Sequence, residues 1–404
     1  MQDITIHDSR YSWTRLAITL AIAIVCNVGM WAVIMVLPAV QAEFGTDRAA
    51  ASLPYTATMF GFALGNLLIG RAVDRFGVMV TLMGAGVLIA ASYFAATYAT
   101  SIAVLCLIHV GIGLGTAAGF GPLMADISHW FMKRRGIAVA IAASGNYLSG
   151  AIWPLLLTGV LIEDGWRGVY VALSLVTLLI MLPLCLLLRR RVPANAMQRA
   201  DLQSSANQSG TGFSPRQLQI LLAVAGFGCC MAMAMPQVHI VALCIDLGFG
   251  PAVGAEMLSL MLFGGVASRL LSGVVADWIG GVRTLLIGSV AQCVALFLYL
   301  PFDGLVSLYI VSLVFGLSQG GIVPSYAVIV REYLPAREAG ARIGFVIMAT
   351  IIGMAVGGWT SGWIYDLTGS YQAAFLNGIA WNMLNIGIML HILTKTPRLQ
   401  RSAA

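Results

Sequence analysis

Charged residues are scarce in this sequence. Of its 404 residues only 9% are Asp, Glu, Lys or Arg, whereas 59% are hydrophobic. Soluble domains carry about 25% charged residues, so this composition excludes an ordinary soluble domain. It predicts an all-α integral membrane protein. The net charge of +6 then reports orientation in the membrane, and we expect no binding to nucleic acid.

Patterns typical of other protein classes are also missing. Residues 1–15 are polar and the apolar run after them is too long for a signal-peptide core, so we expect the first helix to remain. The seven cysteines show no metal-ligand spacing, which predicts buried thiols and no metal. Because no catalytic constellation is present, we expect neither an enzyme nor a bound cofactor.

Twelve apolar runs are present, each near the ~20 residues that a membrane-spanning helix needs. They lie at about residues 16–38, 50–70, 78–98, 102–127, 136–160, 168–188, 217–243, 254–275, 281–300, 305–330, 339–364 and 371–393. We therefore predict twelve transmembrane helices in a protein that is a monomer in the lipid bilayer.

The basic residues predict the orientation. Lys and Arg of short loops collect on the cytoplasmic side of a membrane. With both termini cytoplasmic, only Arg48 and Arg167 lie outside, and Arg269 is the only basic residue that we cannot place in a loop. We predict this orientation, in a bacterial inner membrane.

The second half of the chain repeats the first. Gly70, Asp74 and Gly77 recur 203 residues later as Gly273, Asp277 and Gly280. Residues 189–216 are polar and rich in Ser, Gln and Gly, which predicts a cytoplasmic linker between domains 1–188 and 217–404. A duplicated twelve-helix pattern is typical of secondary transporters.

The repeated segment carries a family resemblance. Residues 70–77 read Gly-x-x-x-Asp-Arg-x-Gly, which resembles the loop motif of the major facilitator superfamily. The resemblance implies two pseudo-symmetric six-helix bundles. Asp74 and Asp277 end helices, where a carboxylate can accept from N–H groups of a neighbouring helix start or pair with Arg75 or Arg135. We predict that these four residues gate the carrier; the alternative is a solvated turn.

Arg269 is the strongest candidate for a substrate contact. A guanidinium within a span costs at least ~2.5–3.5 kcal/mol, and no carboxylate lies one turn away on the same helix. Such a charge suits a mobile anion, and guanidinium matches a carboxylate in bidentate geometry. The alternative is a structural arginine bonded to backbone carbonyls of a broken helix.

Further motifs are similar to the monocarboxylate porters within the superfamily. They are residues 130–138, residues 142–150, the Gly-Trp-Arg triplet at 165–167, and Arg269 four residues before Gly273. In that family the arginine of this helix is the site for the substrate carboxylate. Many animal members place an aspartate one turn earlier, where this chain has Gly265, so the resemblance leaves the proton carrier unassigned.

Several polar residues within apolar runs are weaker candidates. His109 and His239 are candidates for both proton coupling and substrate contact, although a histidine in a span can also be simply hydrogen-bonded to a neighbour. The other candidates for substrate contact are Asn27, Asn146, Tyr147, Gln319 and Tyr326. Interhelical hydrogen bonding is the alternative for each.

Together these features predict a secondary transporter of a small organic monocarboxylate, coupled to a proton in symport. An organic anion exchanger is the nearest alternative. A carrier of another small solute and a non-transporting membrane sensor are further alternatives.

Overall fold

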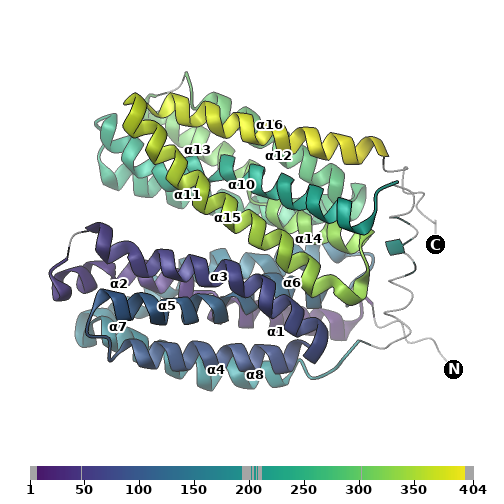
Figure 1. The fold of residues 1–404 in the computed structure, drawn as a ribbon, viewed down its shortest axis with the longest axis horizontal. Helices are drawn as coiled ribbons and strands as arrows, with labels where there is room; N and C mark the ends of the chain where they lie inside the picture. Colours follow the sequence, from purple (N-terminus) through teal and green to yellow (C-terminus); the bar gives the residue numbers. More distant parts are fainter. Residues whose placement is uncertain are drawn as a thin grey trace. The chain divides into compact units, whose positions relative to one another are not determined.

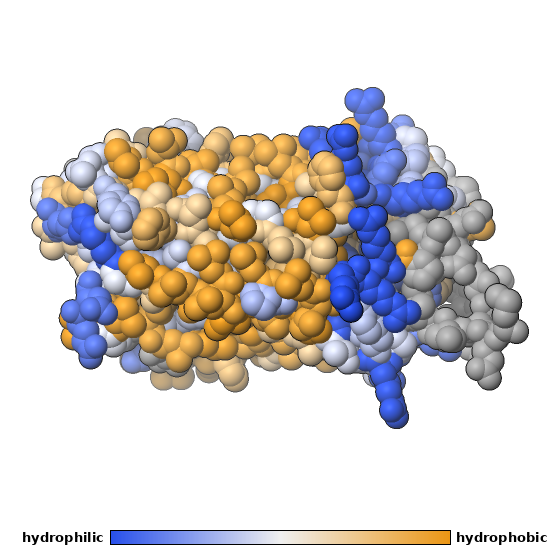
Figure 2. Space-filling model, turned by 90° about the horizontal axis from the view of Figure 1, so that it is seen from below, coloured by the Kyte–Doolittle hydropathy of each residue, from blue (hydrophilic) through white to orange (hydrophobic). Residues whose placement is uncertain are grey.

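The computed structural model describes residues 7–46, 48–192, 202, 204, 205, 207, 212–301 and 303–395. Within them the chain is helical and has no β-strand, which confirms the predicted all-α class. In this described part of the chain, twelve helical segments are long and apolar enough to span a membrane, which confirms the predicted number. The face in Figure 2 shows a broad belt of hydrophobic side chains bounded by hydrophilic residues.

The helices follow one another along the chain as Figure 1 labels them. Their bounds are α1 Arg10–Cys26, α2 Val28–Phe44, α3 Arg48–Phe76, α4 Val78–Ala96, α5 Ile102–Thr116, α6 Gly121–Ser128, α7 Arg135–Val176, α8 Leu182–Leu186, α10 Pro215–Asp246, α11 Pro251–Ile279, α12 Gly281–Leu298, α13 Leu305–Gln319, α14 Ile322–Tyr333, α15 Ala339–Thr368 and α16 Tyr371–Lys395. α7 contains two spans, because Gly165 adopts φ 69° and ψ −171° and interrupts the helix there.

The helices group into two compact units. Unit 1 comprises Met1–Lys133, Ile141–Met197 and Arg337–Met348, and unit 2 comprises the rest of the chain. The first residues of α7 thus belong to unit 2, and the first residues of α15 belong to unit 1. The predicted linker 189–216 falls largely outside the described residues, so its boundaries stay predictions.

The internal repeat extends to contacts between backbones. In unit 1, a Cβ on Gly113 of α5 would lie 2.0 Å from the Thr58 carbonyl oxygen of α3. In unit 2, a Cβ on Gly316 of α13 would lie 2.2 Å from the Met261 carbonyl oxygen of α11. Each pair is separated from its counterpart by 203 residues. Only glycine permits such close helix contacts, which place α3 beside α5 and α11 beside α13 (Figure 1).

The fourth span of each unit is interrupted near its middle. In unit 1, α5 passes through a 3₁₀ turn, Ala117–Gly119, into α6. In unit 2, α13 ends at Gln319 and α14 begins at Ile322. A break of this kind frees backbone N–H and C=O groups inside the membrane, and other groups must satisfy them.

The sequence predicts that Arg269 is the only arginine buried within a helix, and the structure corrects this prediction with two more buried arginines. Arg15 is 1% exposed in α1, which begins earlier than predicted, and Arg331 is 1% exposed in α14. Arg15 forms a buried bidentate pair with Asp126 of α6, with nitrogen–oxygen distances of 2.9 and 3.0 Å. Its guanidinium also lies over the ring of Trp130, 4.5 Å from the centroid. The prediction overlooked this pair because the two residues stand 111 positions apart in the sequence.

Candidate functional site

Arg269 lies at the break in the fourth span of unit 2. Its side chain is buried on α11, and Nε donates to the carbonyl oxygen of Gly320 at 2.9 Å. The helices touch here because Gly320 has no side chain: a Cβ would lie 2.0 Å from the carbonyl oxygen of Gly265. The guanidinium is therefore held against the freed end of α13.

Gln319 immediately precedes the carbonyl that Arg269 binds. It is 1% exposed, and neither Nε2 nor Oε1 has a hydrogen-bond partner among the described residues. A buried amide without partners costs about 1–3 kcal/mol for each unsatisfied group. Arg269 and Gln319 thus bring a positive charge, a free donor and a free acceptor to one helix break.

The break in unit 1 is held by neutral side chains. Asn66, which precedes Arg269 by 203 residues, is fully buried on α3, and its Oδ1 accepts from the N–H of Gly121 at 3.3 Å. Asn27 donates from Nδ2 to the carbonyl of Gly119 at 2.9 Å. Asn66 is not among the residues predicted from the sequence, although the repeat offset of 203 residues from Arg269 identifies it.

His109 lies within unit 1, away from this break. Thr58 donates its hydroxyl hydrogen to the Pro54 carbonyl at 2.9 Å, so its oxygen must accept from His109 Nδ1 at 2.8 Å. The other ring nitrogen, Nε2, then accepts from the Tyr170 hydroxyl at 2.9 Å. Both nitrogens of His109 are occupied in a fully buried network.

Asn146 and Tyr147 lie together on α7. The backbone and side-chain oxygens of Asn146 accept from Trp31 Nε1 at 3.0 and 3.2 Å. Tyr147 is half-buried on the same helix.

In unit 2, Tyr326 donates to Asn385 Oδ1 at 3.0 Å, and Asn385 Nδ2 donates to Ser289 at 2.7 Å. The substrate roles of these residues stay predictions.

His239 is half-buried on α10, near the end of unit 2 that lies opposite Asp277. Its Nε2 donates to the Gly358 carbonyl of α15 at 2.8 Å. The Tyr371 hydroxyl of α16 lies 3.4 Å from Nδ1. The imidazole therefore bridges three helices of the same unit.

The two repeated aspartates each bind the start of another helix. Asp277 accepts from the N–H groups of Gly136 and Ile137 at the start of α7, at 2.5 and 3.0 Å. We call these contacts the Asp277 latch. Asp74 accepts from Gly340 and Ala341 at the start of α15, at 2.9 and 2.7 Å. A carboxylate at a helix N-terminus is stabilised by its free N–H groups and by the helix dipole.

The predicted arginines lie beside these contacts in the sequence. Arg75 follows Asp74 and lies over the ring of Phe76, 5.3 Å from its centroid, while Arg135 is the first residue of α7. The hydrogen bonds of both aspartates are thus present, and the gating roles of all four residues stay predictions.

The chain matches the family model of the Major Facilitator Superfamily over residues 19–241 and 220–403. Monocarboxylate transporter 13 of Bos taurus is 27% identical over 352 residues, covering 84% of this chain and 78% of that protein. Monocarboxylate transporter 11 of Homo sapiens is 28% identical and covers 76% of this chain and 67% of that protein. The agnestins efflux protein AgnL12 of Paecilomyces divaricatus is 23% identical and covers 87% and 80%.

Solved structures share the fold. The fucose:proton symporter FucP of E. coli superposes with a TM-score of 0.73 at 13% identity, covering 96% of this chain and 100% of that one. The human organic anion transporter MFSD10 superposes with a TM-score of 0.74 at 16% identity, covering 94% and 99%.

Proposed function

The chain belongs to the major facilitator superfamily, and on that premise we propose that it is a secondary transporter of a small organic monocarboxylate, coupled to a proton in symport. Membership in this family of multi-pass transporters agrees with the resemblance read from the loop motifs, and its relatives are transporters rather than enzymes. The names of the two mammalian relatives support a monocarboxylate as the substrate.

One comparison within the chain carries the proposal. The breaks in the fourth spans have the same place in the two repeats, and Asn66 and Arg269 occupy the same place beside them. In unit 1, neutral amides bind two of the freed backbone groups, the Gly119 carbonyl and the Gly121 N–H. A guanidinium in a span costs at least ~2.5–3.5 kcal/mol, and its planar group matches a substrate carboxylate in bidentate geometry.

Gln319 supports the same assignment. A guanidinium can bind a carboxylate through two parallel N–H···O bonds, and the adjacent amide offers one donor and one acceptor for the remainder of the molecule. Both amide groups lack partners in the described residues, so a ligand that satisfies them recovers a cost that the folded protein otherwise bears.

The mechanism we propose is alternating access. The carboxylate binds the guanidinium from one side of the membrane, the neutralised site permits the conformational change, and the anion leaves on the other side. Transport of one proton with one monoanion is electroneutral. A pH gradient then drives uptake by about 1.36 kcal/mol per pH unit, while the membrane potential contributes little.

The test is transport by Arg269→Gln in proteoliposomes, after thermal-shift screening of the wild type against short monocarboxylates. A bidentate charged contact contributes about 3 kcal/mol or more, since each hydrogen bond to a charged group is worth about 1.5–3 kcal/mol. We therefore expect uptake to fall by about two orders of magnitude. The control is Arg283→Gln, the same substitution at an exposed arginine of α12, with uptake near that of the wild type.

Uptake by Arg269→Gln within a few-fold of the wild type would refute the carboxylate assignment. The proton is tested separately, because uptake that ignores an imposed pH gradient excludes symport. An anion exchanger remains the alternative, and it is recognised by uptake that requires carboxylate inside the vesicles.

A further inference from the structure

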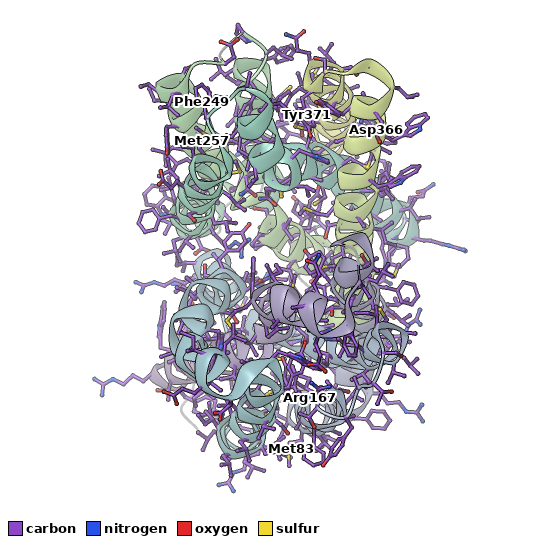
Figure 3. All side chains as sticks on the ribbon, turned by 90° about the vertical axis from the view of Figure 1, so that its left-hand side faces the viewer. Met83, Arg167, Phe249, Met257, Asp366 and Tyr371 are labelled. Carbon is purple, nitrogen blue, oxygen red and sulfur yellow. The ribbon has the colours of Figure 1, made fainter. Side chains whose placement is uncertain are left out.

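Two buried hydroxyl groups in unit 1 have no hydrogen-bond partner among the described residues. They are Oη of Tyr93 on α4 and Oγ1 of Thr116, the last residue of α5. Both side chains are 0% exposed. A buried hydroxyl without a hydrogen bond costs free energy, so we expect each of these groups to bind a partner. Figure 3 draws the side chains of this unit as sticks and labels Met83, which lies on α4 with Tyr93.

The two hydroxyl groups lie close to one point at the start of α2. A Cβ on Gly29 would lie 2.3 Å from Thr116 Oγ1 and 3.3 Å from Tyr93 Oη. Although both oxygens are near this point, they do not hydrogen-bond to each other. A single water molecule can bridge two oxygens in such positions, because each O–H···O hydrogen bond spans about 2.7–2.8 Å.

The residues around this point favour a small neutral ligand. The three atoms nearest to the position of such a Cβ belong to Thr116, Ile112 and Tyr93, which are all uncharged side chains. A hydroxyl group both donates and accepts, so its partner should be able to do the same. Water has this property, and a buried water binds about two to four polar groups that otherwise lack partners.

The internal repeat distinguishes this place from its counterpart in unit 2. Thr116 precedes Gln319 by 203 residues, and each of the two residues ends the first half of the fourth span in its unit. The residue that corresponds to Tyr93 is Leu296, which is apolar and fully buried. Unit 2 therefore lacks the second hydroxyl group at this place, and the pair of hydroxyl groups is a feature of unit 1.

We propose that unit 1 binds a structural water molecule, which is hydrogen-bonded to Tyr93 Oη and Thr116 Oγ1 and lies beside Gly29. The water bridges α4 and α5 and lies against the start of α2. Because α1 ends at Cys26 and α2 begins at Val28, this is the place where the first span changes from one helix to the next. The inference goes beyond the proposed transport, since it requires neither a carboxylate nor a proton.

Removing one hydroxyl group tests the water, because the sign of its effect on stability depends on whether the water is bound. With the water in place, Tyr93→Phe removes one of its hydrogen bonds and destabilises the protein. Without it, the same substitution removes a buried polar group that has no partner, and the protein becomes more stable. Thr116→Val, which keeps the branched shape of the side chain, has the same two outcomes.

The experiment measures the melting temperature of the purified protein in detergent. We expect Tyr93→Phe and Thr116→Val each to lower it by roughly 2–4 °C, the shift for the loss of about one hydrogen bond in a domain of comparable size. The double variant should lower the melting temperature by less than the sum of the two single shifts, because both substitutions act on the same water.

Two control variants carry the same change from tyrosine to phenylalanine. Tyr299→Phe removes a buried hydroxyl group that is hydrogen-bonded to Ser312 at 3.0 Å, and it should lower the melting temperature. Tyr98→Phe removes a hydroxyl group from a side chain that is 70% exposed, and it should leave the melting temperature unchanged. The shift of Tyr93→Phe should resemble that of Tyr299→Phe.

A melting temperature that rises or stays unchanged in either single variant overturns the water site. A cryo-EM map of the wild type that shows ordered waters gives an independent readout if the variants do not fold. A peak within hydrogen-bonding distance of both Tyr93 Oη and Thr116 Oγ1 supports the site, and a map with other buried waters but no peak here overturns it. Neither measurement involves transport, so the result is independent of the assay with Arg269→Gln.

Discussion

Replacing Gly136 with alanine tests whether the Asp277 latch depends on close packing of two helices. A Cβ on Gly136 would lie 2.3 Å from the Gly273 carbonyl oxygen and 2.9 Å from Asp277 Oδ1. Backbone atoms cannot turn away as a flexible side chain can, so the start of α7 must move away from α11. The two hydrogen bonds from Gly136 and Ile137 to Asp277 then lengthen or break.

The expected effect is large. Overpacking of this kind costs about 1–3 kcal/mol, and each hydrogen bond to a charged group is worth about 1.5–3 kcal/mol. The closed latch should therefore lose at least about 1.4 kcal/mol, which is a tenfold change in its population. Hydrogen–deuterium exchange of the peptide that contains Gly136 and Ile137 should accelerate by at least that factor.

The control is Gly84→Ala on α4, where a Cβ would meet no atom within 4 Å. Alanine favours a helix over glycine by about 1 kcal/mol, so this variant should leave the exchange of the α7 start unchanged. If Gly136→Ala also leaves that exchange unchanged, the aspartate does not hold the N–H groups of α7, and the gating prediction for Asp277 loses its structural basis.

Two further predictions concern ion pairs in unit 1. Asp126→Asn leaves the buried charge of Arg15 without its carboxylate and should destabilise the protein by about 3–5 kcal/mol, measured by thermal unfolding; the double variant Arg15→Met/Asp126→Leu should be less destabilised. The hydrogen bond from Arg167 holds the pKa of Glu43 below its usual range. The ionised carboxylate therefore stabilises the fold at pH values above the usual carboxyl pKa of about 4.3. This stabilisation is lost as the pH falls through the lower pKa of the folded state. The difference in melting temperature between the wild type and Glu43→Gln should accordingly be constant near neutral pH and shrink below about pH 4.

The spans could be predicted from the sequence because the bilayer imposes a length and a composition on each helix. The interruptions in the fourth spans could not. Residues 102–128 form one apolar run, and no proline precedes Gly119 to mark the turn there. The break is held by side chains from other helices, and a pattern within one helix carries no information about them.

Because a pattern within one helix says nothing about contacts with other helices, the sequence identifies some site residues and not others. Arg269 was recognised because a charge in an apolar run is conspicuous. Asn66 is neutral, so its residue type does not mark it as a site residue, although it binds the equivalent break in unit 1. Arg15 stands among polar residues near the N-terminus, a context that predicts a loop, yet it pairs with Asp126 in the interior.

Two requirements meet at Arg269: a backbone group freed by the helix break needs a hydrogen bond, and a buried charge needs stabilisation. In the duplicated fold, unit 1 shows the first requirement without the second. Each unit must satisfy the backbone groups freed by its own break, and unit 1 meets this requirement with the neutral Asn66 and Asn27. In unit 2, Arg269 donates from Nε to the carbonyl of Gly320, a hydrogen bond that a neutral donor could also form. Asn66 and Arg269 stand at the same position of the two repeats and differ in charge, and under the proposed function the charge binds the ligand while the hydrogen bond stabilises the fold. An assay that measures stability and transport separately therefore distinguishes the two contributions within one residue.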